Sequence, residues 1–219
     1  MREWDEYWAK APKTHNRIYD RIAVFYRKYI IKPYLRHYFS RYFPNRATIL
    51  HAGCGGGQVE EGIIDPGSVI GLDISMNALS LYKRNHHGSD LIRGDVRTTG
   101  FRADSMDGIY NLGVMEHFSE EEINRIMLEF RRILKKDGVI ILFWPPRYGA
   151  TIIFLKGIHF FFNSVLGKNV RLHPPEPSLI KSRGHVETMV RRAGFRMVSY
   201  HFGIADLFTY GVVILEKAG

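Results

Sequence analysis

The sequence predicts one α/β domain with a doubly wound, mostly parallel sheet of seven strands in a Rossmann-like arrangement. Three observations lead to this fold class. Short apolar segments alternate with helical patterns through the middle of the chain, as in parallel sheets. Several of these segments end in glycine or a carboxylate, as strands do where ligands bind at their carboxyl ends. The segment 138–144 is almost wholly apolar, which indicates a strand covered on both faces.

Residues 1–47 form an N-terminal helical segment that is rich in aromatic residues. An apolar stripe at helical spacing runs from Ile18 to Tyr29, and a second one runs from Pro33 to Phe43. Proline is tolerated in the first turn of a helix, so we expect a separate second helix to begin there. Most of these aromatic side chains are expected to pack on the core, although they can also fold over a ligand.

The core segment, 48–144, begins with a short strand over 48–50 that leads into a turn with four glycines between residues 53 and 57. A turn that lets a ligand approach backbone N–H groups leaves no room for Cβ atoms, which explains the glycines. A helix over 59–64 would then point the positive end of its dipole at the ligand. We therefore expect a ligand at this turn.

Four more strands and two capped helices follow within the core segment. Ser75 suits the N-cap of the first helix. Ser119 and Glu122 form a capping box at the start of the second helix, which is expected to end at Gly138 after two lysines. The strands are expected over 68–73, 91–95, 107–112 and 138–144.

The core is followed by a lid-like insertion at 145–183 and by a C-terminal segment at 184–219. The core fold does not require the insertion, which carries isoleucine- and phenylalanine-rich runs and then a basic stretch with prolines. In the C-terminal segment we expect a helix over 185–193 and an antiparallel strand pair on the sheet edge over 196–202 and 211–216.

The formal net charge of +9 is concentrated in two basic blocks. Residues 1–47 hold 11 Lys/Arg against 4 Asp/Glu, and residues 145–196 hold 9 against 2, which gives +7 in each block. Residues 48–144 hold 10 against 14, a net of −4. The electrostatic field of two basic blocks favours an anionic partner, such as a phosphate-bearing substrate, nucleic acid or an acidic membrane surface. Solvated helix faces are the alternative explanation.

The cysteine content and the apolar segments predict a cytoplasmic location. Cys54 is the single cysteine, and the first residues contain no apolar signal-peptide core. The longest apolar stretch, 150–166, contains polar residues and is shorter than the roughly 20 residues of a spanning helix. A peripheral contact with an anionic membrane surface stays open, and the sequence does not indicate an oligomeric state.

Two common nucleotide-binding patterns do not fit the glycine turn. A dinucleotide fingerprint needs a third glycine where Gln58 stands, although Asp73 lies at the spacing expected for a ribose ligand. No lysine follows the glycines, which disfavours a nucleoside triphosphate.

Taken in order, the motifs resemble those of the class I S-adenosylmethionine-dependent methyltransferases, in particular the small ubiquinone/menaquinone-biosynthesis and sterol-type group (methyltransferase type 11). Each motif alone is weak, whereas their order and intervals are specific. The resemblance implies S-adenosyl-L-methionine as the cofactor and S-adenosyl-L-homocysteine as the product. It covers about residues 19–217, and the similar segments are 19–23, 49–57, 69–75, 94–96, 111–118, 134–138 and 193–195.

The resemblance also implies roles for individual residues. Asp73 would accept hydrogen bonds from both ribose hydroxyls, and Asp95 would bind the adenine amino group. Ile74 and Val96 would sandwich the adenine ring. His51 stands where the family usually has an acidic residue, and a packing role is favoured for it. The implied cofactor site consists of His51, Ala52, Gly53, Cys54, Gly55, Asp73, Ile74, Asp95, Val96, Asn111 and Leu112.

Glu116 and His117, after the fourth strand, are the candidates for a general base, which is needed only if the acceptor holds its proton. The alternative is that both residues only shape this loop. No metal site is expected. We expect the insertion and the N-terminal helices to cover a hydrophobic or amphiphilic small-molecule acceptor, anionic ones included. RNA or DNA methylation and a non-catalytic cofactor-binding domain are the alternatives.

Overall fold

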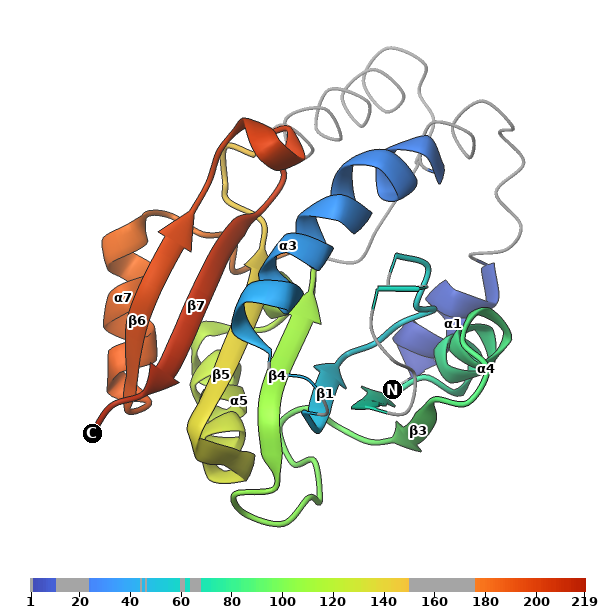
Figure 1. Ribbon diagram of the computed structural model, residues 1–219, viewed down its shortest axis with the longest axis horizontal. Coiled ribbons are helices and arrows are strands. Elements are labelled where there is room, and N and C mark those ends of the chain that lie inside the picture. The colour runs from blue at the N-terminus through green and yellow to red at the C-terminus, as the bar shows by residue number, and fades with distance from the viewer. Residues whose placement is uncertain are drawn as a thin grey trace.

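The computed structural model describes residues 2–10, 24–43, 45, 47–59, 62–63, 68–149 and 176–219. Seven strands form one sheet in the order β3-β2-β1-β4-β5-β7-β6 (Figure 1). The first five strands pair in parallel, and β7 is antiparallel to both β5 and β6. This confirms the predicted fold class. The strands are β1 (Ile49–Ala52), β2 (Val69–Asp73), β3 (Asp90–Arg93), β4 (Met106–Leu112), β5 (Leu134–Trp144), β6 (Phe195–His201) and β7 (Gly211–Lys217).

Two of the predicted helices begin at serine residues whose side chains cap the first turn. The Ser75 hydroxyl accepts a hydrogen bond from the N–H of Ala78, and the capping box between Ser119 and Glu122 is present, as predicted. Two short 3-10 turns, η4 (Met115–His117) and η6 (Ile204–Asp206), lie in loops at the carboxyl side of the parallel strands. The α-helices are α1 (Arg2–Lys10), α3 (Lys32–Tyr42), α4 (Met76–Asn85), α5 (Glu120–Ile133) and α7 (Arg183–Arg192).

The end of α5 differs from the prediction. The helix stops at Ile133, and the residues up to Gly138 belong to β5. Leu134 has an extended backbone and pairs with Met106 of β4, so strand pairing overrides the helical pattern at this point. The ammonium group of Lys135 lies 2.6 Å from the Asp107 carboxylate instead of at the end of the helix.

The N-terminal helical run is also joined differently from the prediction. Helical residues continue without a break from 24 to 42, with a π turn, η2 (Arg27–Ile31), directly before α3. Pro33 lies in the first turn of α3, where it lacks an N–H donor and its ring would crowd the preceding turn. A wider π turn accommodates such a residue, so the run has a local irregularity in place of the expected break.

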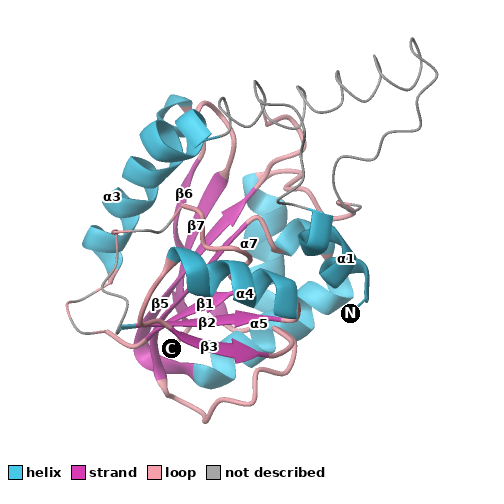
Figure 2. Cartoon of the chain, turned by 90° about the vertical axis from the view of Figure 1, so that its right-hand side faces the viewer, coloured by secondary structure: helices cyan, strands magenta, loops and turns pink. Residues whose placement is uncertain are grey.

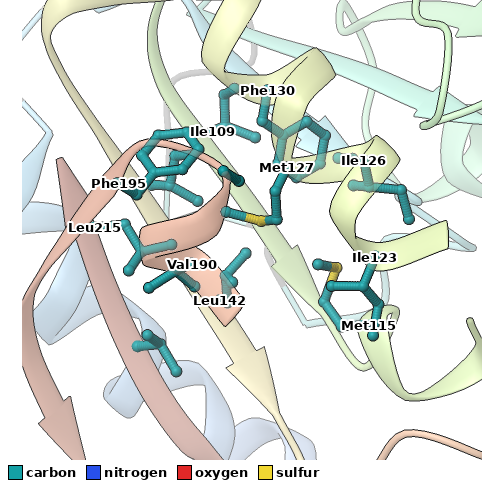
Figure 3. Packing of buried hydrophobic residues seen from close by; sticks show 14 of the residues in the cluster. Ile109, Met115, Ile123, Ile126, Met127, Phe130, Leu142, Val190, Phe195 and Leu215 are labelled. Carbon is teal, nitrogen blue, oxygen red and sulfur yellow. The ribbon is translucent and has the colours of Figure 1, made fainter. Parts of the chain in front are cut away.

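Helices cover both faces of the sheet, with α3 on one side and α7 on the other (Figure 2). On the α5 and α7 face, Phe130 and Val190 pack over Ile109, Leu142 and Leu215 (Figure 3). On the opposite face, α3 contributes to a second buried cluster with residues of β1, β4, β5 and β7. Burial on both faces explains the apolar character of the central strands. The α3 side chains in this cluster are Leu35, Tyr38 and Phe39.

The two ends of the insertion meet beside the end of β5. The N–H of Ile180 donates to the carbonyl of Pro145 at 3.1 Å, and the N–H of Arg147 donates to the carbonyl of Ile180 at 2.9 Å. The predicted apolar runs of the insertion, within 150–175, lie outside the described residues, as does the predicted motif at 19–23. None of the described helices is long and apolar enough to cross a lipid bilayer.

Candidate functional site

The glycine turn after β1 has the backbone conformation that its glycines permit. Gly53, Gly55 and Gly57 have φ angles of 71°, 53° and 60°, in the left-handed region. A Cβ atom at Gly55 would lie only 2.7 Å from a ring carbon of Trp8, which comes from α1. Glycine is therefore required at this position both by the backbone and by the approach of an aromatic side chain.

Several backbone donors of this turn have protein acceptors, whereas the expectation that a ligand lies at the turn stays a prediction. The N–H groups of Gly53 and Cys54 both donate to the carbonyl of Leu72, at 2.8 and 2.9 Å. The N–H of Gly55 donates to the Asp73 carboxylate at 2.8 Å. The described residues of the helix expected over 59–64 form a bend and a turn, and the others lie outside the described part. The turn is thus fastened to the end of β2.

Asp73 ends β2 and is the centre of this fastening. Its side chain is buried, and its second oxygen accepts the N–H of Ser75 at 2.9 Å. Burial raises the pKa of the carboxyl group, against the effect of the backbone donors from Ser75 and Gly55. A carboxylate has about four acceptor positions. Positions therefore remain for the ribose hydroxyls that the family resemblance implies for this residue.

Asp95, for which the family resemblance implies a bond to the adenine amino group, is bound by a neighbouring guanidinium. Arg97 donates from Nη2 at 2.7 Å and from Nε at 3.0 and 3.1 Å, and these bonds hold the pKa of the Asp95 carboxyl below its usual range. Arg97 also binds Glu122 of α5 at 2.6 Å. An adenine at Asp95 would have to share this carboxylate with Arg97. The neighbouring Val96 is buried and Ile74 half-buried.

His51 lies in the middle of β1 and is almost completely buried. Its ring stacks on Tyr110 of β4, with centroids 4.2 Å apart, and also contacts Tyr82 of α4. Burial, with a smaller contribution from His86, lowers the pKa of His51 to about 3, so the ring is neutral near pH 7. These contacts are those of a packing residue. Its neighbour Ala52, at the end of β1, is fully buried as well.

Asn111 and Leu112 lie at the carboxyl end of β4, where a ligand is expected in a parallel sheet. The side chain of Asn111 has no exposed surface, and neither its amide nitrogen nor its amide oxygen has a hydrogen-bond partner in the described part of the chain. Buried polar atoms are nearly always paired, so such an amide calls for a ligand.

Glu116 and His117 lie on η4, directly beyond β4. Only 4% of Glu116 is exposed, its Oε2 atom has no hydrogen-bond partner among the described residues, and its burial, reinforced by Glu176, raises the pKa to about 8. His117 Nε2 lies 4.0 Å from Glu116 Oε1. The ring of His117 meets Trp4 of α1 edge to face at 4.9 Å.

Comparison with known proteins agrees with these features. The family profile of the methyltransferase domain matches residues 50–142, which span β1 to β5. Residues 50–142 form an S-adenosylmethionine-dependent methyltransferase domain with the class I fold. No curated protein sequence gave a match.

Solved structures resemble this methyltransferase in fold. One from Thermotoga maritima, described as a possible histamine N-methyltransferase, has a TM-score of 0.65 at 17% identity over 99% of this chain and 100% of its own. Magnesium protoporphyrin IX methyltransferase from Synechocystis, with bound S-adenosylhomocysteine, has a TM-score of 0.61 at 16% identity over 86% and 82%. A TehB-like methyltransferase from Corynebacterium glutamicum has 0.55 at 19% over 80% and 82%.

The residues of the methyltransferase fit its cofactor, S-adenosylmethionine. The buried amide of Asn111 could offer both a donor and an acceptor to the methionine part of the cofactor, and Asp73 could offer acceptors to the ribose. Within the described residues, no group of three or more metal-ligating side chains comes together.

Three contacts from α1 were missed at the sequence level. Asp5 accepts a hydrogen bond from the Ser75 hydroxyl at 2.7 Å, Trp8 lies against the glycine turn, and Trp4 lies against His117. Helix α1 thus crosses the site from Gly55 to the loop after β4, beside α4 (Figure 1). The spacing of Trp4 and Trp8 by four residues places both on one helical face, and this signal could have revealed the contact.

Proposed function

We propose that this methyltransferase transfers the methyl group to a hydrophobic or amphiphilic small-molecule acceptor that binds beside Glu116, and that Glu116 accepts the proton of the acceptor. One observation carries this proposal. Glu116 is buried next to the carboxyl end of β4 with an unpaired Oε2 atom. A buried carboxyl group without a partner costs stability, and such groups are kept where they serve binding or catalysis.

The cofactor supplies an electrophilic methyl carbon on a sulfonium, whose bond to sulfur breaks as the bond to the acceptor atom forms, so that the sulfur keeps the electron pair. The remaining work is positioning and exclusion of water. Asn111 would orient the methionine part of the cofactor, and Asp73 would fix the ribose. Trp4 and Trp8 would shield the reacting atoms from water. The proton of an O–H or N–H acceptor would pass to Oε2 of Glu116.

The surroundings of Glu116 favour an acceptor with an apolar body. A Cβ atom at Gly113 would lie 3.2 Å from Glu116 Oε1 and 3.8 Å from the hydroxyl of Tyr210, so both groups flank the same point after β4. Trp144, the last residue of β5, is buried, and its indole N–H donates to the carbonyl of Ser178, whose N–H donates to the carbonyl of Glu116. Burial raises the pKa of Tyr210, which therefore stays a hydrogen-bond donor. Aromatic neighbours with few other polar groups suit a hydrophobic or amphiphilic ligand.

His117 has a supporting part in this proposal. Its ring lies between Glu116 and Trp4, at 4.0 Å from the carboxylate and 4.9 Å from the indole. From there it would hold the loop and the α1 side chains in place. The side chain of Glu116 is more deeply buried than that of His117, and its Oε2 atom has no hydrogen-bond partner among the described residues. We therefore assign the proton transfer to Glu116 and a positioning role to His117.

The test compares Glu116→Gln with Glu121→Gln, an exposed glutamate on α5. Formation of S-adenosylhomocysteine is measured with a panel of alkyl-chain phenols, carboxylic acids and amines, with tRNA as the nucleic-acid probe. We expect turnover of an alkyl-chain acceptor to fall by about 100-fold or more in Glu116→Gln, with cofactor affinity unchanged by calorimetry. The rate of the parent protein should rise with pH up to about 8, as Glu116 ionises.

Three results would contradict the proposal. Equal turnover in Glu116→Gln and the parent protein would remove the proton-accepting role. Methylation of tRNA with no transfer to the alkyl-chain panel would indicate a nucleic-acid enzyme. Cofactor binding without transfer to any acceptor of the panel would indicate a non-catalytic domain.

A further inference from the structure

One end of the molecule exposes a concentration of large apolar side chains. Eight of the thirteen exposed large hydrophobic side chains of the described residues lie there, and Ile204 is 75% exposed. Single exposed apolar residues are common, whereas a contiguous group marks an interaction surface. We name this group the apolar tip. It consists of Val24, Phe25, Tyr29, Tyr148, Phe202, Ile204, Leu207 and Phe208.

The apolar tip is one surface although its residues come from three parts of the chain. The hydroxyl of Tyr26, within the N-terminal helical run, donates to the carbonyl of Asp206 at 2.9 Å and forms a short hydrogen bond with the Thr209 hydroxyl. A Cβ atom at Gly149 would lie 3.1 Å from the carbonyl of Phe208, which brings the residues after β5 against the same loop. In Figure 1 the start of the helical run and η6 lie at the same end of the molecule.

The β6–β7 loop holds its apolar residues outward in a strained conformation. Leu207 and Phe208 have φ angles of 56° and 57°, although bulky side chains avoid the left-handed region at a cost of about 1–2 kcal/mol each. Asp206 fixes this conformation, because its buried carboxylate accepts the N–H of Tyr210 at 2.6 Å. Backbone strain that the surrounding structure maintains is typical of functional loops.

The elements that carry the apolar tip have a positive net charge. The helical run from 24 to 42 carries five basic residues and no acidic one. Arg147 is exposed beside Tyr148, and the single acidic residue of the β6–β7 loop, Asp206, is fully buried. Exposed apolar groups among cations match the headgroup region of an anionic bilayer, where each Lys or Arg adds about 1 kcal/mol. The basic residues of the helical run are Arg27, Lys28, Lys32, Arg36 and Arg41.

We propose that the apolar tip docks this methyltransferase on an anionic phospholipid surface and presents its acceptor site to the lipid. The β6–β7 loop leads directly into Tyr210, whose hydroxyl lies beside Glu116 at the acceptor side. Docking through this loop would let an amphiphilic acceptor enter from the bilayer without crossing water. The presentation of the acceptor rests on the function proposed above, whereas the docking itself does not.

The experiment is co-sedimentation of the full chain with vesicles of phosphatidylcholine alone and of phosphatidylcholine with phosphatidylglycerol, at low and high salt. We expect binding to the anionic vesicles only, weakened by salt. The double variant Phe25→Ser/Ile204→Ser should lower the partition coefficient at least about tenfold, since two inserted side chains are lost. The control Leu128→Ser replaces a side chain that is 49% exposed on α5, away from the tip, and should bind as the parent protein does.

Several outcomes would overturn the docking proposal. The proposal would be wrong if the parent protein failed to bind anionic vesicles at low salt. It would also be wrong if the double variant bound as well as the parent protein. An equal loss in Leu128→Ser would show that the tip has no special part. A concentration-dependent dimer that the double variant abolishes would assign the tip to a second copy of the chain. Calorimetric cofactor affinity, expected to be unchanged in all variants, separates these outcomes from a failure of the methyltransferase site.

Discussion

The two sides of the site differ in how their buried polar groups are satisfied. On the side of β1 and β2, Asp73 accepts the N–H groups of Gly55 and Ser75, and Leu72 accepts those of Gly53 and Cys54. On the side of β4 and β7, buried polar atoms lack hydrogen-bond partners within the described residues. These atoms belong to Asn111, Glu116 and Asp206.

This difference is the one expected between a structural scaffold, whose buried polar groups are all bonded, and a surface whose buried polar groups can bond to a ligand. Hydrogen bonds on the β1–β2 side form during folding and hold the glycine turn in one conformation. Unpaired buried groups on the β4–β7 side lower stability until a bound molecule supplies partners. Ligand binding should therefore tighten the second side more than the first.

The largest expected effect concerns Glu116 and pH. The pKa of this carboxyl group rises from its usual 4.5 to about 8 on folding, so between these pH values the folded protein binds one proton more than the unfolded chain. This contribution lowers the free energy of unfolding by up to about 1.4 kcal/mol for each pH unit as pH rises through the window. Urea unfolding from about pH 5 to about pH 8 should show a steeper decline in the parent protein than in Glu116→Gln. Equal pH dependence of the free energy of unfolding in the two proteins would contradict a buried, unpaired carboxyl group at Glu116.

A smaller effect of opposite sign is expected for Asn111→Leu. Leucine has a similar shape and removes two buried polar atoms without partners, so the free energy of unfolding should rise by about 1–2 kcal/mol. Cofactor affinity should fall at least about tenfold, because the methionine part loses a donor and an acceptor. Urea unfolding and calorimetry measure the two changes. Asn124→Leu, at an exposed position of α5, is the control and should alter neither. Destabilisation with unchanged affinity would mean that the amide has a structural partner.

The smallest effect tests the scaffold side through two helix caps. Ser75 caps α4 and also donates to Asp5 of α1, whereas Ser182 caps α7, which packs on β6. Each change to alanine should cost about 1 kcal/mol of stability. Only Ser75→Ala should speed dissociation of the cofactor, measured by stopped-flow, because α1 loses a contact across the site. Equal dissociation rates in the two variants would show that α1 does not retain the cofactor.

The scaffold side could largely be predicted from the sequence, because its features depend on neighbours along the chain. The cap at Ser75, the capping box at Ser119 and Asp73 at the end of a strand all follow from local patterns. The predicted end of α5 was wrong, because Leu134 pairs with Met106 on another strand instead of continuing its own helix. The protein acceptors of the glycine turn were missed for the same reason.

The β4–β7 side was predicted only in part, because it is assembled from remote segments. Trp4, Glu116 and Tyr210 are separated by about a hundred residues each, and no motif connects them. Glu116 and His117 were found as candidates only because they follow the fourth strand. Nothing in the sequence around Asp206 indicates that its carboxylate is buried, because this depends on the packing of the N-terminal helical run against the β6–β7 loop.

The three tryptophans, which dominate the intrinsic fluorescence, lie in two different surroundings. Trp4 and Trp8 lie on α1 across the site, whereas Trp144 is buried with its indole N–H bonded to the carbonyl of Ser178 at 2.6 Å. Ligand binding at the site would therefore change the surroundings of two emitters, whereas the third is buried in the core. The intrinsic fluorescence of the unlabelled chain would thus report occupancy mainly through the two tryptophans of α1.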